Sequence, residues 1–247
     1  MNLSDINVEK INGVNITLWR AHNNNDATVN GVSLGLICPG AGYINGIQVG
    51  GLGVRAKHEM KGISLGLLGV TSGKNLTGIA IGGLGVNAGE NITGITVGLL
   101  GAGAGTNIKG VAIGGLGAGA GCDMKGFSMG LLGAGAKGNM TGFTIGGIGA
   151  GCGCTLTGLT IGGIGAGARF IKGVTIAMGR VNAAEAGSMT GFSASLYNEI
   201  KGRQQGLVIG IYNMVYELNG FQIGLINYVR DNPRARKILP LINWNFS

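Results

Sequence analysis

Residues 94–125, GITVGLLGAGAGTNIKGVAIGGLGAGAGCDMK, contain the same sixteen-residue pattern twice. The pattern begins at Gly62 and returns at every sixteenth residue as far as Gly158, and a unit one residue shorter leads to Gly173. A looser register continues toward both ends of the chain, which gives about thirteen units in all. Repetition at a fixed short period is typical of solenoids, in which each unit packs only on its neighbours.

Each unit holds two short stretches in which the residue types alternate. Ile79 and Ile81 flank Ala80, and Val86 and Ala88 flank an asparagine. A period of two predicts strands, and the glycine and asparagine residues between the stretches suit tight corners. We therefore expect an all-β fold, a glycine-rich β-solenoid of about thirteen 16-residue coils spaced by about 4.8 Å.

The repeat also predicts the organisation of the chain. Residues 1–30 are expected to form an N-terminal segment and cap, 31–190 the 16-residue-repeat β-solenoid, and 191–247 degenerate repeats and a C-terminal cap. Caps are expected because the end of a solenoid exposes unpaired backbone. An antiparallel β-barrel remains the alternative, because the sixth column of the repeat alternates between leucine and glycine from Leu67 to Gly147.

Two columns of large apolar residues are predicted to line the core of the solenoid, since one residue of each would recur in every coil. The first column is Leu68, Leu84, Leu100, Leu116, Leu132, Ile148 and Ile164. The second column is Ile63, Ile79, Ile95, Val111, Phe127, Phe143 and Leu159.

Two further columns are expected to lie on the outside. Side-chain amides recurring at one corner can bond to their own turn and to the next coil. This predicts a corner ladder of Asn75, Asn91, Asn107, Asp123 and Asn139. Glycines recurring at an outward position predict a flat, uncharged assembly face, formed by Gly85, Gly101, Gly117 and Gly133.

No catalytic, cofactor-binding or metal-binding residues are predicted, so we do not expect an enzyme. His22 and His58 have no acidic or cysteine partner at motif spacing, and Cys152 and Cys154 are better explained by small positions of the repeat. The glycine-rich turns recur without the helix that a phosphate-binding loop requires. The net charge is +8, but the 18 basic residues are scattered, so nucleic acid is not an expected partner.

The end of the chain resembles a known group of proteins. Residues 220–228, GFQIGLINY, and 239–243, LPLIN, resemble the bacterial surface-repeat proteins built of G-L-Q-I-G-L-I-N units, and the likeness is best over residues 206–247. The resemblance implies a bacterial cell-surface or extracellular protein of unassigned function. The first sixteen residues have no apolar run of the kind found in signal peptides, so a cytoplasmic location stays open.

These features predict a non-enzymatic structural or adhesive surface protein. It is expected to self-associate through its flat glycine face into a homo-oligomer or filament, with a surface polymer or lipid as a possible further partner. One alternative is a membrane-active or pore-forming assembly, which the 11% of charged residues and the mean hydropathy of +0.36 favour. Binding of ice or another polymer is the second alternative.

Overall fold

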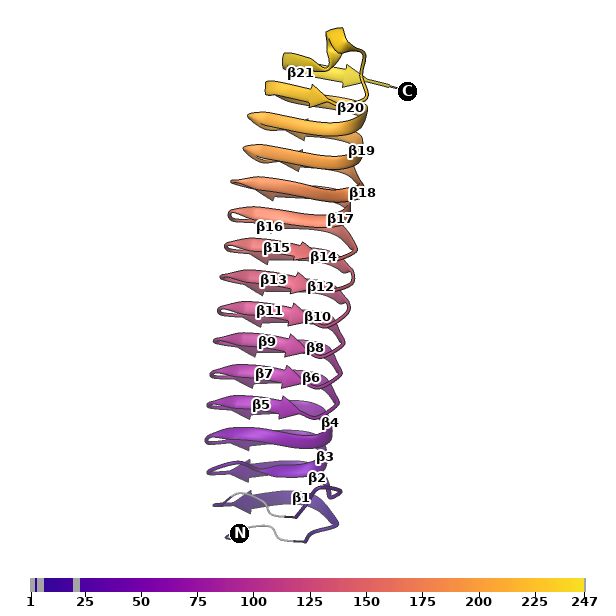
Figure 1. Cartoon of the computed structure of the whole chain (residues 1–247). Coiled ribbons are helices and arrows are strands. Elements are labelled where there is room, and N and C mark those ends of the chain that lie inside the picture. Colours follow the sequence, from indigo (N-terminus) through magenta and orange to yellow (C-terminus); the bar gives the residue numbers. More distant parts are fainter. Residues whose placement is uncertain (1–2, 4–6, 20–22, 247) are drawn as a thin grey trace. The chain divides into compact units, whose positions relative to one another are not determined.

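In the computed structural model the described residues are 3, 7–19 and 23–246. They form β-strands stacked coil upon coil, and the only helix among them is a short 3-10 turn, η1 (Arg234–Arg236) (Figure 1). The chain divides into two compact units, Met1–Cys122 and Asp123–Ser247, called unit 1 and unit 2 below. The β-solenoid of about thirteen coils that the repeat predicts is therefore the fold of this protein.

In unit 1 a regular coil consists of a long strand, a corner, a short strand and a second corner. In one coil these strands are β6 (Asn75–Gly82) and β7 (Gly85–Ala88), and each pairs in parallel with its equivalent one repeat away. The repeat of the sequence is thus the hydrogen-bonding register. The other strands of unit 1 are β1 (Lys10–Thr17), β2 (Thr28–Gly35), β3 (Gly40–Gly50), β4 (Gly53–Gly66), β5 (Gly69–Ser72), β8 (Asn91–Gly98), β9 (Gly101–Ala104), β10 (Asn107–Gly114) and β11 (Gly117–Ala120).

Unit 2 repeats this arrangement and ends differently. Its last strand pairs antiparallel with the strand before it, and all other pairings between its described strands are parallel. The antiparallel alternative that the sequence left open is therefore not the fold. The strands are β12 (Met124–Gly130), β13 (Gly133–Ala136), β14 (Met140–Gly146), β15 (Gly149–Cys152), β16 (Thr155–Gly162), β17 (Gly165–Ala177), β18 (Arg180–Ala194), β19 (Tyr197–Ile209), β20 (Tyr212–Val229) and β21 (Ile238–Asn245).

The core is lined by other residues than those predicted. In the coil of β6 and β7 the buried side chains are Leu76, Ala80, Val86 and Ala88, each at most 2% exposed. The prediction that the two large apolar columns line the core is wrong, because their members point outward and are exposed or partly exposed. These outward residues are Leu68, Leu84, Leu100, Leu116, Ile63, Ile79, Ile95 and Val111 in unit 1, and Leu132, Ile148, Ile164, Phe127, Phe143 and Leu159 in unit 2.

The reason for the reversal is the narrow space between the long and the short strand beside the corner that joins them. Both sides of a long strand carry apolar residues, so the alternation alone does not choose the buried side. A Cβ atom on the inward-facing Gly82 would lie 2.1 Å from the carbonyl oxygen of Gly85, in the short strand across the corner. Where backbones come this close only glycine fits, and small alanine side chains fill the neighbouring positions. Ile79 and Ile81 therefore point to the outside.

Candidate interaction surfaces

Four columns of outward apolar side chains form one surface on unit 1, which we call the aliphatic surface. Two columns lie on the long strands, where the parallel register places Ile79 beside Ile63 and Ile81 beside Leu65. The other two lie at the adjoining corner, where backbone hydrogen bonds connect successive coils. The exposed members are Val14, Ile16, Leu18, Leu34, Leu36, Ile47, Leu52, Ile63, Leu67, Leu68, Ile79, Ile81, Leu84, Ile95, Leu99, Leu100 and Leu116.

The aliphatic surface of unit 1 is large for a surface exposed to water. The seventeen side chains just named, all within the described part of the unit, are between 37% and 73% exposed. A fully exposed aliphatic side chain presents on the order of 100 Å² of apolar area, so together they present roughly 800 Å². Monomeric proteins rarely leave a contiguous apolar patch larger than a few hundred Å² without a partner.

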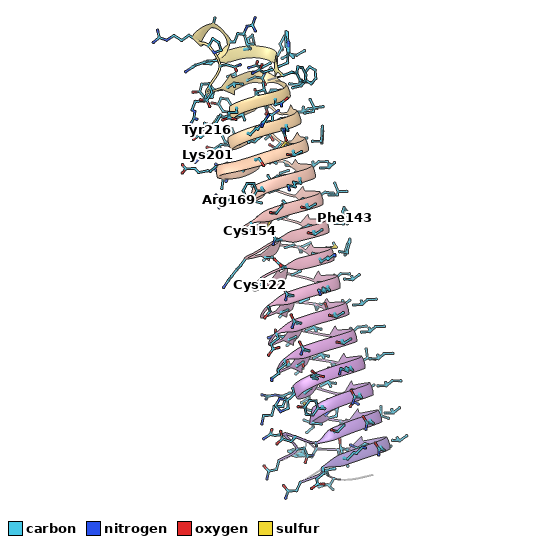
Figure 2. All side chains as sticks on the ribbon, turned by 90° about the vertical axis from the view of Figure 1, so that its right-hand side faces the viewer. Cys122, Phe143, Cys154, Arg169, Lys201 and Tyr216 are labelled. Carbon is cyan, nitrogen blue, oxygen red and sulfur yellow. The ribbon has the colours of Figure 1, made fainter. Side chains whose placement is uncertain are left out.

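Unit 2 carries an equivalent surface. Figure 2 shows Phe143 on one side of this unit and Cys154, Arg169 and Lys201 on the other. Exposed apolar residues follow the same columns as in unit 1, because the strands that carry them pair in the same parallel register. The exposed members in its regular coils are Met129, Leu131, Leu132, Ile148, Leu159, Ile161, Ile164, Val174, Ile176 and Met178.

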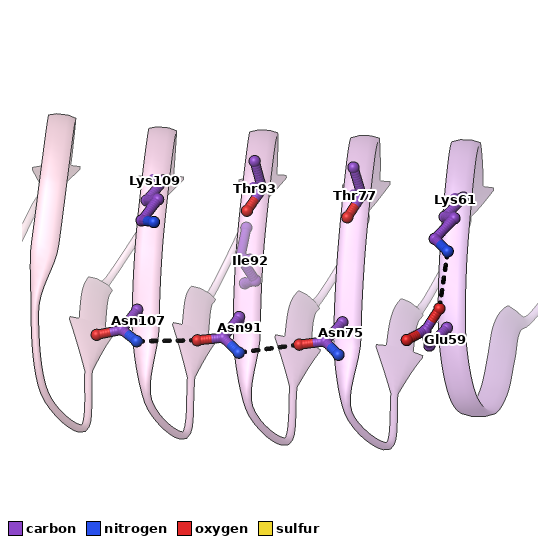
Figure 3. A pocket seen from close by; sticks show the side chains of 9 residues that line it. All are labelled: Glu59, Lys61, Asn75, Thr77, Asn91, Ile92, Thr93, Asn107 and Lys109. Atoms are coloured by element: carbon purple, nitrogen blue, oxygen red, sulfur yellow. Dashed lines mark hydrogen bonds and ion pairs between the residues drawn. The ribbon is translucent and has the colours of Figure 1, made fainter.

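The predicted corner column makes side-chain hydrogen bonds within each unit. In unit 1 Asn107 Nδ2 donates to Asn91 Oδ1 at 3.0 Å, and Asn91 Nδ2 donates to Asn75 Oδ1 at 2.9 Å (Figure 3). In unit 2 Asp123 Oδ1 accepts hydrogen bonds from the backbone N and the Nδ2 of Asn139. These bonds connect one coil to the next, so their immediate effect is to hold the register of the stack.

A shallow groove of about 480 Å³ runs along the ladder of unit 1 (Figure 3). It also contains Lys61, Thr77, Thr93 and Lys109, which form a polar column between the ladder and the aliphatic surface. We call this the rim column. Lys61 donates to Glu59 at 2.9 Å, and this hydrogen bond lowers the pKa of the Glu59 carboxyl group. The groove is polar and open, and its charged pair is already satisfied.

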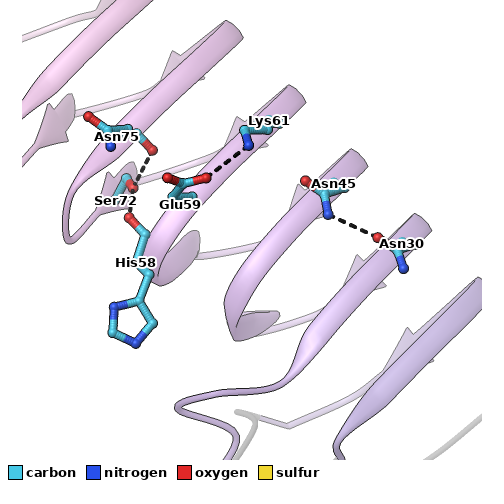
Figure 4. A network of polar contacts seen from close by, with 7 residues as sticks. All are labelled: Asn30, Asn45, His58, Glu59, Lys61, Ser72 and Asn75. Carbon is cyan, nitrogen blue, oxygen red and sulfur yellow. Dashed lines mark hydrogen bonds and ion pairs between the residues drawn. The ribbon is translucent and has the colours of Figure 1, made fainter.

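A second amide ladder, which was not predicted, lies in the first coils of the same rim column. Asn45 Nδ2 donates to Asn30 Oδ1 at 2.9 Å (Figure 4), and Asn30 Nδ2 donates to Asn12 Oδ1 at 2.9 Å. The signal was present in the sequence, because each of these residues precedes the glycine that begins a repeat. Nearby, the Ser72 hydroxyl group lies 3.0 Å from the carbonyl oxygen of His58.

A third ladder is buried in the last coils of unit 2. Asn198 Nδ2 donates to Asn213 Oδ1, and Asn213 Nδ2 donates to Asn227 Oδ1, both at 2.8 Å. All three side chains are fully buried. The recurrence of tyrosine-asparagine at 197–198 and 212–213 is the sequence signal that could have indicated it. Buried amides are stable only when their hydrogen-bonding groups are paired, so this ladder is structural.

The glycines of the predicted assembly face lie at outward positions. Gly85, Gly101 and Gly117 begin the short strands of unit 1, Gly133 begins β13 of unit 2, and all four are partly exposed. A Cβ atom on Gly101 would lie 3.4 Å from the carbonyl oxygen of Gly117, which is ordinary van der Waals contact. This face presents mainly backbone, and its role in assembly stays a prediction.

The titratable groups of the described residues are not gathered into a metal centre. His58 lies 3.4 Å from Asp26 and stacks on the ring of Tyr43, and His22 lies outside the described residues. Burial raises the pKa of the Cys152 thiol. Within the described part of the chain, no three residues among His, Cys, Asp and Glu are grouped so that they could hold a metal ion.

Comparisons with known proteins add no further assignment. The chain matches no protein-family model, no curated protein and no solved structure. Among the described residues, no helix has the length and apolar character needed to cross a membrane. The functional argument therefore depends on the surfaces described above.

Proposed function

We propose that this protein is a non-enzymatic structural repeat protein that self-associates, with the aliphatic surface as the contact between copies. The observation that carries the proposal is the outward direction of the large aliphatic side chains, with seventeen exposed members in the described part of unit 1. Water is a poor environment for such a surface, and its burial is the main favourable term in most protein association.

The size of the surface supports a second copy of the chain as its partner. Roughly 800 Å² on each partner is the area of a standard specific protein–protein interface. The estimate counts only aliphatic side chains of unit 1, so any contact made by unit 2 would add to it. The resemblance of residues 206–247 to bacterial surface-repeat proteins is consistent with a structural role at a bacterial cell surface.

The aliphatic surface is a better candidate for the contact than the glycine face. Burial of apolar side chains contributes about 25 cal/mol for each Å² removed from water. The outward residues Gly101 and Gly103 bring no side chain to an interface, whereas most positions of the aliphatic surface bring a large one. We therefore move the proposed contact from the glycine face to the aliphatic surface.

One observation favours the membrane-active alternative. Lys61 and Lys109 lie in the rim column, directly beside the aliphatic columns. Basic residues along the border of an apolar surface are typical of proteins that lie on anionic lipid, because the amine can reach the headgroups while the apolar side chains enter the bilayer. A lipid surface is therefore the second candidate partner.

Sizing the full chain by light scattering over a range of concentrations tests the proposal. We expect a dimer or larger assembly at micromolar concentration. The variant Ile79→Lys with Ile95→Lys should be monomeric, because both lysines would place charge in the middle of the contact. The matched variant Gly101→Lys with Gly103→Lys adds the same charge to the short strand β9, which lies in the opposite layer, and it should assemble like the parent.

Two results would overturn the proposal. One is a parent protein that stays monomeric at high concentration, and flotation of that monomer with anionic vesicles would then support the lipid alternative. The other is an assembly that survives the two lysines at Ile79 and Ile95 but is lost with those at Gly101 and Gly103, which would return the contact to the glycine face.

A further inference from the structure

One column of the aliphatic surface differs from the others, because large and absent side chains alternate in it. We call it the Leu/Gly column. Its first member is Leu18, which lies beside Leu36, and from there the successive coils of unit 1 place in it Leu36, Gly51, Leu67, Gly83, Leu99 and Gly115. Leu36, Leu67 and Leu99 are the most protruding side chains of the surface apart from Val14, at 67% to 73% exposed, whereas Leu18 is 37% exposed. The neighbouring leucine column has a leucine in every coil, each 44% to 48% exposed, from Leu52 to Leu116.

The gaps between the protruding leucines are imposed by the backbone. A Cβ atom on Gly83 would lie 1.7 Å from the carbonyl oxygen of Leu67, and one on Gly115 would lie 1.7 Å from that of Leu99. No side chain can occupy these positions without displacing the backbone of the preceding coil. Unit 1 therefore presents a row of knobs two coils apart, about 9.6 Å, with a permanent hole between each pair.

We infer that two copies of unit 1 pack antiparallel about a two-fold axis that passes between the coils of Leu67 and Gly83, with each knob of one copy in a hole of the other. This inference rests on the proposed self-association through the aliphatic surface. Leu67 then meets Gly83 of the second copy, Leu99 meets Gly51, and Leu36 meets Gly115. All six positions from Leu36 to Gly115 are matched, and Leu18 lies before the matched part of the column.

Geometry selects this arrangement from the possible face-to-face pairs. When the two solenoid axes run parallel, the side-by-side order of the columns is reversed from one copy to the other, so the Leu/Gly column of one copy lies against a different column of the second copy. When the axes run antiparallel, the two Leu/Gly columns lie against each other, and the register along the axis then decides the fit. An axis that passes through a coil places leucine against leucine, whereas an axis midway between two coils places every leucine against a glycine. Such a two-fold contact is self-complementary and closed.

The pattern favours a second copy over a fluid partner. A lipid surface adapts to any apolar shape, so it gains nothing from knobs and holes at fixed spacing. A β-solenoid of the same spacing matches them, because interlocking side chains at the strand repeat give the dry, close contact seen between stacked sheets. In unit 2 the column reads Leu131, Gly147, Gly163 and Met178, so the strict alternation is confined to the coils of unit 1 from Leu36 to Gly115.

Distances between spin labels in the full-length dimer test the arrangement. The native cysteines are first replaced, Cys38 and Cys152 by alanine and Cys122 and Cys154 by serine, and unchanged melting shows that the fold is kept. A single nitroxide-labelled cysteine then replaces Thr77, Thr93 or Lys109, all in the rim column outside the Leu/Gly column.

The three labels are expected to give three different distances. For Thr77 the two labels are one coil apart along the solenoid axis, for Thr93 three coils and for Lys109 five coils, which is about 5, 14 and 24 Å of axial separation. The distance between the two labels perpendicular to the solenoid axis is the same for all three positions. Equal distances at the three positions would overturn the antiparallel arrangement while leaving self-association intact, whereas a monomeric parent would overturn the proposed function itself.

A pair of truncations tests the knobs directly. Leu67→Ala with Leu99→Ala removes two knobs, and Leu68→Ala with Leu100→Ala removes two leucines of the adjacent column, which are 45% and 46% exposed. We expect the knob variant to weaken dimerisation at least tenfold more than the control variant, measured by analytical ultracentrifugation. Equal weakening by the two variants would contradict the knob-and-hole contact.

Discussion

Aspartate substitutions at Leu100 and Ile108 should distinguish an outer column of the solenoid from an inner one by the stability that each substitution costs. Leu100 belongs to the leucine column and is 46% exposed, whereas Ile108 lies on β10 and is 1% exposed. The two residues are close in sequence and of similar size. The loss of stability expected from a negative charge is nevertheless small at Leu100 and large at Ile108.

The magnitudes follow from these exposures. Fully burying a leucine side chain contributes about 1.5–3 kcal/mol, and about half of Leu100 is already in water, so Leu100→Asp should lower the free energy of unfolding by about 1 kcal/mol. Ile108→Asp loses about 2–5 kcal/mol of burial and packing, and the unpaired buried carboxylate adds about 3–5 kcal/mol. That total approaches the whole stability of an ordinary domain, about 5–15 kcal/mol.

Urea unfolding followed by far-ultraviolet circular dichroism measures both variants. It should be repeated at several protein concentrations, because association of the parent adds to its apparent stability. The reasoning is refuted if Leu100→Asp is as damaging as Ile108→Asp when extrapolated to the monomer, since Leu100 would then lie inside. A folded Leu100→Asp variant should also fail to assemble, because its charge lies on the aliphatic surface.

Two further predictions concern unit 2. Asn213→Ala should lower the free energy of unfolding by about 2–4 kcal/mol, because it leaves buried amide partners on both neighbouring coils unpaired. Asn139→Ala, at an exposed ladder, should lower it by about 1 kcal/mol or less, measured by the same urea titration. Equal losses of stability in the two variants would contradict the difference in burial. Cys152 should be alkylated by iodoacetamide more slowly than an unstructured peptide thiol at the same alkaline pH, because burial raises its pKa and reduces the thiolate fraction. Mass spectrometry of the peptides measures the alkylation rate, and a rate equal to that of the peptide thiol at every pH would contradict this prediction.

The repeat itself could be predicted from the sequence, and so could the hydrogen bonds that depend only on the repeat. Residues one period apart occupy the same place in successive coils, so the recurrence of Asn75, Asn91 and Asn107 leads directly to contact between their side chains. The parallel register needs no information beyond the period. These features are local to one column, and a column is visible in the sequence.

The direction of each column was decided only by the tertiary structure. One side of the long strand β6 carries Ile79 and Ile81, the other carries Leu76 and Ala80, and both are compatible with a buried side in a pattern of period two. The close approach of the two layers, seen where Gly82 faces Gly85, leaves room for Ala80 inside and places Ile79 and Ile81 outside. Because the distance between layers comes from how the whole coil closes, no single stretch of sequence contains it, and the surface proposed to carry function appears only in the folded coil.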